Sequence, residues 1–326
     1  MRDHGGNIDG AIARFGGGAG DWVDLSTGIN RVPYPLPPLP DSAWRDLPTR
    51  AATGALIDAA RAAYRAPTET GLLPLAGAQA AIQLLPRLRP PGRARVLGPT
   101  YNEHAASLRA AGWQVEEIAD PAALAGADLA VVVNPNNPDG REIPVDALLA
   151  HSGKVGTLVV DESFADPRPD LSLAPQAGRP GLLVLRSFGK FYGLAGLRLG
   201  FVLGPASLIA RLSGMAGPWP VSGAAIEIGR RALADTAWQE ATIARLRAET
   251  GRLDRLAGGA GWELAGGTDL FRLYRTPDAG AAQDRLARAR IWSRIFPWSP
   301  ALIRLGLPGT AAEWARLETA LARDLP

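Results

Sequence analysis

Short apolar runs alternate with helical periodicity through the middle of the chain. Residues 55–65 and 78–87 place apolar side chains at helical spacing. Between and after them lie runs rich in Val, Leu and Ile, bounded by Gly, Pro or Asp, which predict mostly buried strands at 95–97, 114–118, 129–133, 157–160, 182–185 and 199–203. Strands joined by helices in this order predict an α/β fold with a mostly parallel, doubly wound sheet.

The C-terminal part of the chain follows a different order. Residues 222–256 carry one long helical pattern. A shorter alternation follows it and predicts strands within 262–274 and at 302–305, with helices at 279–290 and 311–323. We therefore expect a smaller α+β domain beside the domain that contains the sheet.

The N-terminal segment predicts little regular structure. It has three consecutive glycines at 16–18 and five prolines between positions 33 and 40, and proline is excluded from helix interiors and central strands. No Gly-Lys-Ser/Thr follows the glycines and no strand precedes them, so neither a phosphate loop nor a dinucleotide loop is predicted. We expect residues 1–50 to form an arm and part of the small domain, 51–215 the large domain, and 216–326 a linking helix and the rest of the small domain.

Composition is that of an ordinary globular protein. Hydrophobic residues make up 47% and charged residues 21% of the chain, and the net charge is only +3 with the basic residues scattered, so we expect no nucleic-acid partner. No apolar run reaches the roughly 18 residues of a membrane span and the N-terminus lacks a signal peptide, so we expect a cytoplasmic protein without a membrane partner. The absence of cysteine and the wide spacing of the three histidines predict no metal site.

Lysine is nearly absent from this chain. Of the 35 lysine and arginine residues, only Lys154 and Lys190 are lysines. Arginine cannot lose its proton in proteins, whereas a deprotonated lysine amine can attack a carbonyl carbon. Lys154 lies in the loop-like stretch 151–154 and is interpreted as a surface residue. Lys190 is therefore the candidate for covalent chemistry.

Polar residues directly follow three of the predicted strands. Ligands of open α/β sheets bind beyond the carboxyl ends of the strands, so these residues are candidates for a site. The stretch 134–140 follows the first strand, Asp161 the second, and the stretch 186–198 the third. Lys190 comes about 30 positions after Asp161, and Arg198 comes eight positions after Lys190. Each feature alone is weak, but together and in this order they form a specific pattern.

This pattern resembles the fold-type I pyridoxal-phosphate enzymes, the aspartate aminotransferase superfamily, over essentially the whole chain. The resemblance implies the fold of those enzymes, pyridoxal 5′-phosphate as cofactor, and a homodimer. It implies that Lys190 holds the cofactor covalently and that Asp161 pairs with the pyridinium nitrogen, so that the ring can accept electrons from the substrate Cα. It further implies that Asn137 bonds the ring's phenolic oxygen, that Tyr101 stacks on the ring face, and that His104 supports Asp161.

A turn before a predicted helix is expected to hold the cofactor's phosphate. Gly77, Ala78 and Gln79 offer backbone N–H groups where the positive end of the helix dipole favours an anion. By the same resemblance, Ser187 and Arg198 would complete the phosphate site. In isolation, Gly77 is better explained as an ordinary glycine at the start of a helix.

Four short segments carry a closer resemblance, to the threonine-phosphate decarboxylases of cobalamin biosynthesis, near relatives of the histidinol-phosphate aminotransferases. They are residues 4–7, 25–30, 161–164 and 219–223. A histidine beside two glycines suits an arm that closes over a substrate phosphate, and the alternative is a disordered terminus. The resemblance implies that His4, Gly28, Ile29 and Asn30 bind a phosphorylated amino-acid substrate.

Arg304 interrupts an apolar strand pattern at 302–305, where a lone charge is costly to bury. Its position matches the superfamily's arginine that binds the substrate carboxylate. A planar guanidinium suits this role because it can donate two parallel hydrogen bonds to one carboxylate. We therefore expect Arg304 to bind the substrate.

Two positions depart from the aminotransferase pattern. Phe164 stands where many relatives have a tyrosine that bonds the cofactor's phenolic oxygen, and Leu47 precedes Pro48 where relatives often have a tyrosine. Transamination needs controlled proton movement between Cα and the cofactor, so both departures favour a decarboxylase.

The leading hypothesis is therefore decarboxylation of L-threonine O-3-phosphate to (R)-1-amino-2-propanol O-2-phosphate with pyridoxal 5′-phosphate. The bond at Cα that stands perpendicular to the cofactor ring is the one that breaks, so the placement of the substrate carboxylate selects the reaction. One alternative is a histidinol-phosphate or related aminotransferase, in which the hydrogen stands perpendicular. The other is a binding protein of the same fold that has lost catalysis.

Overall fold

The computed structural model describes residues 4–322, and contacts divide the chain into two compact units. The smaller unit combines Met1–Pro33, Pro138–Gly140 and Gln239–Pro326, as far as these are described, and the larger unit combines Tyr34–Asn137 and Arg141–Trp238. These boundaries differ from the predicted limits 1–50, 51–215 and 216–326. Contacts do not test which parts of the chain fold independently, so the predicted domain limits stay a prediction.

A seven-stranded sheet forms the larger unit, in the order β2-β8-β7-β6-β5-β3-β4. The strands are β2 (Gly71–Leu75), β3 (Arg93–Leu97), β4 (Gln114–Ile118), β5 (Leu129–Val133), β6 (Leu158–Asp161), β7 (Leu182–Ser187) and β8 (Gly200–Gly204). Strand β8 runs antiparallel to both β2 and β7, and the other pairs are parallel. The predicted mostly parallel α/β sheet is confirmed. Sequence analysis missed β2, whose Pro74 is tolerated because this strand lies at the sheet edge.

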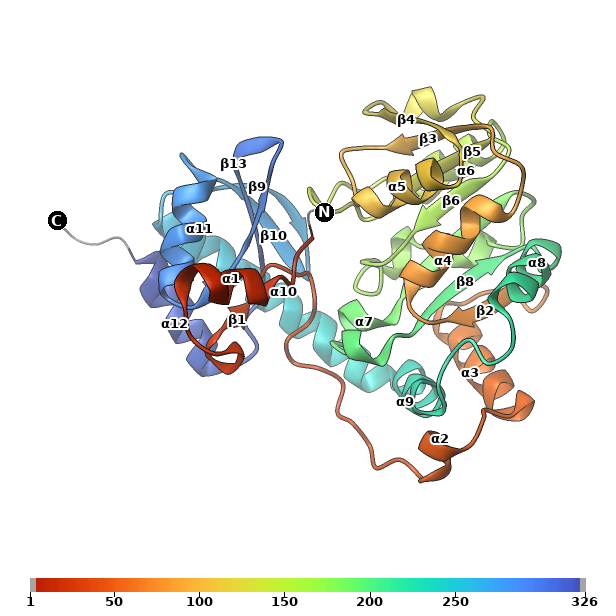
Figure 1. The fold of residues 1–326 in the computed structure, drawn as a ribbon, viewed down its shortest axis with the longest axis horizontal. Helices are drawn as coiled ribbons and strands as arrows, with labels where there is room; N and C mark the ends of the chain where they lie inside the picture. Colours follow the sequence, from red (N-terminus) through yellow and green to blue (C-terminus); the bar gives the residue numbers. More distant parts are fainter. Residues whose placement is uncertain (1–3, 323–326) are drawn as a thin grey trace. The chain divides into compact units, whose positions relative to one another are not determined.

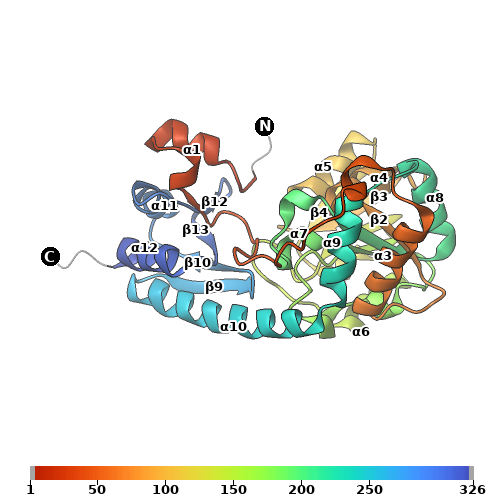
Figure 2. The ribbon, with the colours of Figure 1, turned by 90° about the horizontal axis from the view of Figure 1, so that it is seen from below.

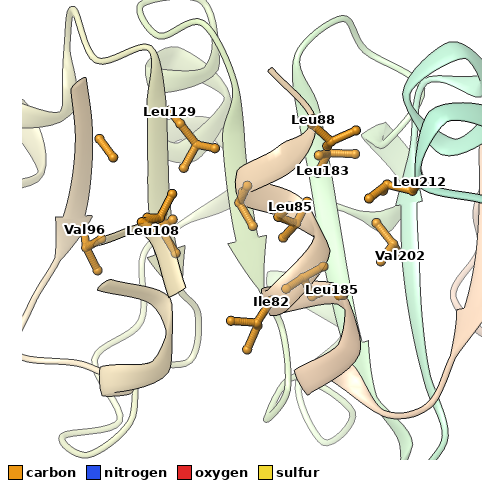
Figure 3. Packing of buried hydrophobic residues seen from close by; sticks show 14 of the residues in the cluster. Ile82, Leu85, Leu88, Val96, Leu108, Leu129, Leu183, Leu185, Val202 and Leu212 are labelled. Carbon is orange, nitrogen blue, oxygen red and sulfur yellow. The ribbon is translucent and has the colours of Figure 1, made fainter. Parts of the chain in front are cut away.

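Helices cover both faces of this sheet (Figure 1). The helices of the larger unit are α2 (Ser42–Arg45), α3 (Arg50–Ala63), α4 (Ala78–Leu84), α5 (Asn102–Ala110), α6 (Val145–Ser152), α7 (Phe188–Phe191), α8 (Ala206–Ala216) and α9 (Gly223–Ala234). On one face, Ile82 of α4, Leu108 of α5 and Leu212 of α8 belong to one apolar cluster with Leu183 and Leu185 of β7 (Figure 3). Because helices cover both faces, a central strand such as the fully buried β5 is apolar on both faces.

The helical pattern at 222–256 is two helices, not the single helix predicted. Helix α9 ends at Ala234 and α10 (Thr236–Gly259) begins after Asp235. The Asp235 carboxylate accepts a hydrogen bond from the backbone N–H of Trp238 at 3.0 Å and so satisfies a donor in the first turn of α10. One non-helical residue barely shifts the phase of the apolar pattern, so the periodicity passes through the break.

The smaller unit contains a four-stranded antiparallel sheet in the order β12-β13-β10-β9. Its elements are β9 (Glu263–Thr268), β10 (Phe271–Arg275), α11 (Ala279–Arg288), β11 (Ile291–Trp292), β12 (Arg294–Phe296), β13 (Ser299–Gly306) and α12 (Ala311–Leu321). Figure 2 shows α10 running along this sheet, where Asp254 of α10 bonds both Arg272 and Tyr274 of β10. The predicted small α+β domain is confirmed. Of the helices within residues 4–322, none combines the length and apolarity needed to cross a membrane.

The N-terminal segment is more regular than predicted. It holds α1 (Ile8–Phe15), β1 (Val23–Asp24), which pairs in parallel with β11, and α2. Helix α1 buries Ala11 in a small cluster with Trp22 and Ala287, and the Asn7 side chain accepts from the N–H of Gly10 at its start. The expectation of an irregular arm is therefore wrong for these segments, because a cap and an apolar face specify a short helix here.

Short 3₁₀ turns complete the chain. They are η1 (Ala19–Asp21), η2 (Leu85–Arg87), η3 (Pro121–Leu124), η4 (Pro169–Leu171), η5 (Ala174–Gln176) and η6 (Ala195–Leu197). Turn η2 continues α4, so that the two together span the helix predicted at 78–87.

Candidate active site

A cavity of about 170 Å³ lies in the larger unit, at the carboxyl ends of β5, β6 and β7. All predicted cofactor-binding residues except His104 line it, namely Gly77, Ala78, Gln79, Tyr101, Asn137, Asp161, Ser187, Lys190 and Arg198. These residues come from separate loops and strand ends, and the sheet order brings them together. The position agrees with the rule that ligands of open α/β sheets bind beyond the strand ends.

Asp161 is the last residue of β6 and is only 2% exposed. Its Oδ1 accepts hydrogen bonds from the backbone N–H and the hydroxyl of Ser163, at 3.0 and 2.5 Å. Burial on its own raises the pKa of Asp161, but the bonds from His104 and Ser163 outweigh burial and hold this pKa below its usual range. Asp161 is therefore a buried, ionised carboxylate at the cavity wall.

His104 stands behind Asp161, on α5, with Nε2 2.8 Å from Asp161 Oδ2. An ionised carboxylate can only accept hydrogen bonds, so Nε2 carries the hydrogen and donates. Oδ2 can accept a second hydrogen bond from an N–H donor in the cavity. Polar residues such as His104 interrupt the apolar pattern of α5, which is why sequence analysis did not predict this helix.

Lys190 lies on α7, a single turn that directly follows β7. Phe188 and Tyr192 flank it in sequence and stack on each other with ring centroids 4.2 Å apart. The Lys190 Nζ lies 5.8 Å from the centroid of the Phe164 ring, which also lines the cavity. The packed aromatic pair fixes the turn that carries the amine.

The turn at Gly77 approaches Arg198 closely. Gly77 has φ +79°, and a Cβ there would lie 2.7 Å from Arg198 Nη2. A Cβ on Gly200 would lie 2.5 Å from the backbone nitrogen of Ala78. Gly77 is the N-cap of α4, as expected of a glycine at the start of a helix, and its missing Cβ leaves room for the Arg198 guanidinium. Its binding of the cofactor's phosphate stays a prediction.

Tyr101 and Gln79 form one side of the cavity. The Tyr101 hydroxyl donates to Gln79 Oε1 at 3.3 Å, and Gln79 Nε2 donates to Glu103 Oε2 at 3.2 Å. The Tyr101 ring meets the His104 ring edge-on, with centroids 6.2 Å apart. Tyr101 thus lies between the turn at Gln79 and the His104–Asp161 pair.

The loop that carries Asn137 leaves the larger unit immediately afterwards, since Pro138–Gly140 belongs to the smaller unit. There, the backbone N–H of Gly267 donates to Asp139 O at 2.9 Å. A Cβ on Gly266 would lie 2.1 Å from the same oxygen. Asn137 is therefore joined through the chain to a close backbone contact on β9.

All predicted substrate-binding residues lie in the smaller unit. Arg304, on β13, is 6% exposed, and its Nη2 donates to the backbone oxygen of Ser26 at 2.6 Å. The Ser26 hydroxyl accepts from the N–H of Gly6 at 2.7 Å. A Cβ on Gly5 would lie 2.5 Å from Ser26 O. Ser26 therefore brings Arg304 and the arm that begins with the exposed His4 together.

Burial and the neighbouring Arg294 lower the pKa of Arg304 to about 9, while Asp24 opposes this shift. The guanidinium still carries its charge at neutral pH, and its carbon lies 4.9 Å from the centroid of the Phe271 ring. A buried cation of this kind attracts an anionic ligand more strongly than an exposed one does.

Asn30 is 2% exposed and held from two sides. Its Oδ1 accepts from the N–H of Val32 at 3.0 Å and from Arg245 Nη2 at 2.8 Å. These bonds fix the orientation of the amide. In the same segment Gly28 is buried and Ile29 half-buried.

Three residues at or beside the cavity were given no site role from the sequence: Ser163 and Phe164 line it, and Gly200 packs against the turn at Ala78. Ser163 orients Asp161, and its signal was a serine two positions after a strand-end aspartate, a spacing at which a side chain bonds the local backbone. Phe164 was noted only for a missing hydroxyl, yet its ring forms cavity wall. Gly200 has no sequence signal, because its need for a missing Cβ arises from the turn at Ala78, which follows the neighbouring strand β2.

Comparison with known proteins identifies the family of this chain and proteins similar to it. The family described as "Aminotransferase class I and II" matches residues 50–295. The chain is 45% identical to the threonine-phosphate decarboxylase of Pseudomonas aeruginosa and 46% identical to that of Sinorhizobium sp, each over 98% of this chain and 97% of the relative. Its fold is similar to that of histidinol-phosphate aminotransferase from Sinorhizobium meliloti in complex with pyridoxal-5'-phosphate, with a TM-score of 0.78 and 20% identity over 96% of this chain and 92% of the other.

The chain belongs to the class I and II aminotransferase family, and the resemblance to fold-type I enzymes is confirmed. Pyridoxal 5′-phosphate is the cofactor of this family, and the cavity fits it. Lys190 offers an amine, and Asp161 an ionised carboxylate suited to a protonated ring nitrogen. Gly77 and Arg198 both line the cavity, and the guanidinium packs where Gly77 lacks a Cβ, so a cationic group lies beside the start of α4.

Proposed function

We propose that this protein decarboxylates L-threonine O-3-phosphate to (R)-1-amino-2-propanol O-2-phosphate with pyridoxal 5′-phosphate. The observation that carries the proposal is the identity of about 45% to two threonine-phosphate decarboxylases over 98% of the chain. Phe164 supports it, since an apolar ring lies near Lys190 where many aminotransferases have a hydroxyl.

The cofactor, when bound, accepts the electron pair released as a bond at the substrate Cα breaks. Lys190 would hold the cofactor covalently through its side-chain amine. Asp161, kept ionised by His104 and Ser163, stabilises the positive charge on the ring nitrogen. Asn137 would bind the phenolic oxygen of the ring, and Tyr101 would stack on the ring face.

Two anionic groups of the substrate need two cationic or hydrogen-donating partners. Arg304 binds the carboxylate, and His4 and Asn30 bind the phosphate. The carboxylate must leave as neutral carbon dioxide, so binding it too tightly would stabilise the ground state more than the transition state. Most of the binding free energy therefore comes from the phosphate contacts.

The test is to incubate the purified enzyme with O-phospho-L-threonine and follow carbon dioxide and aminopropanol phosphate. We expect the enzyme to release both products when no oxo-acid acceptor is present. Consumption of an oxo-acid acceptor without gas release would instead identify an aminotransferase. A protein that binds the cofactor but carries out neither reaction would be identified as a binding protein. Threonine without its phosphate should be used much more slowly, and equal use of both substrates would refute phosphate recognition.

We also propose that the enzyme is a cytoplasmic homodimer that serves cobalamin biosynthesis. Light scattering on the purified holoenzyme measures the assembly, and fractionation of producing cells measures the location. Restoration of cobalamin-dependent growth in a strain lacking a threonine-phosphate decarboxylase tests the pathway. A monomer with full activity would refute the dimer alone.

A further inference from the structure

A buried charge cluster lies behind the cavity, on the other face of the sheet. Side chains alternate along a strand, so Asp161 and Ser187 point toward the cavity, whereas the adjacent Glu162 and Arg186 point the opposite way. Glu162 is 0% and Arg186 4% exposed. Two charged side chains thus occupy the interior directly behind the ends of β6 and β7.

Arg186 joins three segments of the larger unit. Its Nη1 donates to Glu162 Oε2 at 2.8 Å, and its Nη2 donates to Asp166 Oδ1 at 2.5 Å. The guanidinium carbon lies 4.4 Å from the centroid of the Tyr64 ring. One planar group therefore ties the end of β7 to the loop after β6 and to the residue that follows α3.

Glu162 is held on every side. Its Oε2 also accepts from the Ser172 hydroxyl at 2.6 Å, and its Oε1 accepts from the N–H of Leu173 at 2.6 Å. Its backbone N–H donates to Leu185 O at 2.9 Å and so continues the ladder between β6 and β7. Burial raises the pKa of Glu162 above its usual range although Arg186 opposes the shift, so this carboxylate depends on its partners.

Buried ion pairs seldom stabilise a fold more than apolar side chains of the same volume, so stability alone does not explain this cluster. We propose that Arg186 and Glu162 are positioning residues that fix the end of β6 against the end of β7 and thereby direct Asp161 and Lys190 into one cavity. Glu162 directly follows Asp161, and Arg186 lies four residues before Lys190. The inference rests on the cofactor roles proposed for Asp161 and Lys190.

Two conservative variants test it. Arg186→Lys keeps the charge, but one ammonium cannot reproduce the planar fork that reaches both carboxylates. Glu162→Gln keeps the shape and loses the charge. We expect each to weaken binding of pyridoxal 5′-phosphate to the apoenzyme at least tenfold and to shift the pH midpoint of the bound cofactor's absorption band by more than half a unit. Ser172→Ala, which removes one donor to Glu162, should change both in the same direction by less.

Leu124→Ala is the matched control. Leu124 is 0% exposed in η3, beside the outer strands β3 and β4, so its truncation lowers stability away from the cluster. The proposal would be overturned if Arg186→Lys, Glu162→Gln and Ser172→Ala all kept the wild-type cofactor affinity and pH midpoint. It would also be overturned if their changes were no larger than those of Leu124→Ala at an equal loss of melting temperature. A wild-type enzyme that binds the cofactor but releases no carbon dioxide would reject the proposed function and leave this comparison intact.

Discussion

His104 and Asp161, 57 positions apart in the chain, share a 2.8 Å hydrogen bond in the interior of the larger unit. Each side chain is only 2–3% exposed. A carboxylate buried this deeply would ordinarily bind a proton, and the donors from His104 and Ser163 keep it ionised. The charge of Asp161 thus depends on α5, a helix that is separated from β6 by the strands β4 and β5 in the chain.

The His104 bond gives a pH dependence with a defined sign. In His104→Phe the burial of Asp161 is no longer offset by this donor, so its pKa rises and it takes up a proton at higher pH. Turnover needs the ionised form of Asp161. The acid limb of the pH profile of turnover should therefore lie at least about one pH unit higher in His104→Phe than in wild type. Ser163→Ala should move the limb less, and His151→Gln, at a histidine on α6, should not move it. A profile of turnover between pH 5 and 9 that superimposes on wild type would refute this account.

Lys190 should be the residue that binds the cofactor covalently. Borohydride reduction of the holoenzyme should fix the cofactor to a single peptide containing Lys190, read by mass spectrometry. Lys190→Arg should lose this labelling and at least about 10³-fold of turnover, because a guanidinium stays protonated and cannot attack the cofactor aldehyde. Lys154→Arg is the matched control, since Lys154 is exposed and is the only other lysine. Labelling at Lys154 would reverse the assignment.

Asp161→Asn should fold but react slowly. The amide oxygen can still accept from Ser163, and His104 can change tautomer to accept from the amide, so the local hydrogen bonds survive. The lost negative charge should cost about 3 kcal/mol in the step that breaks the Cα bond, or roughly a hundredfold in turnover. Single-turnover absorbance measures that step. A variant within a few-fold of wild type would remove Asp161 from this role.

Arg304 and His4 should affect different kinetic constants. Arg304→Gln should lower kcat/KM for O-phospho-L-threonine by about a hundredfold and also lower kcat, because the carboxylate loses its orientation. His4→Ala should mainly raise KM, because phosphate binding contributes alike to ground and transition states. Arg316→Gln, an exposed arginine on α12, serves as control and should stay within about twofold. An unchanged KM for His4→Ala would exclude the arm from binding the phosphate.

Gly266→Ala should disturb the loop of Asn137 from a distance. A Cβ there meets Asp139 O at 2.1 Å, and this oxygen belongs to backbone that a side chain cannot push aside without moving Asn137's loop. We expect a loss of about 1–3 kcal/mol in the free energy of unfolding, measured in urea, together with a changed absorption maximum of the bound cofactor. Gly251→Ala, in the middle of α10 with only Arg255 nearby, should instead stabilise by about 0.5–1 kcal/mol. A stable Gly266→Ala with a wild-type spectrum would contradict the close contact.

The sequence alone predicted six of the seven strands of the large sheet and marked Lys190 and the strand-end Asp161 as candidates. Apolar runs such as 129–133 specify buried strands because helices must cover both faces, and the rarity of lysine marked Lys190. The same reasoning missed α1, although Asn7 and the apolar face after it are local signals.

Only the tertiary structure decided which distant residues meet. Arg186 with Glu162, Arg304 with Ser26, and Gly266 with Asp139 join positions whose separation in the chain says nothing of their separation in space. Periodicity reports which face of an element is apolar, because that depends on a residue's own neighbours in sequence. Hydrogen-bond partners and the room for a Cβ depend on how the elements pack, so they follow only from the folded chain.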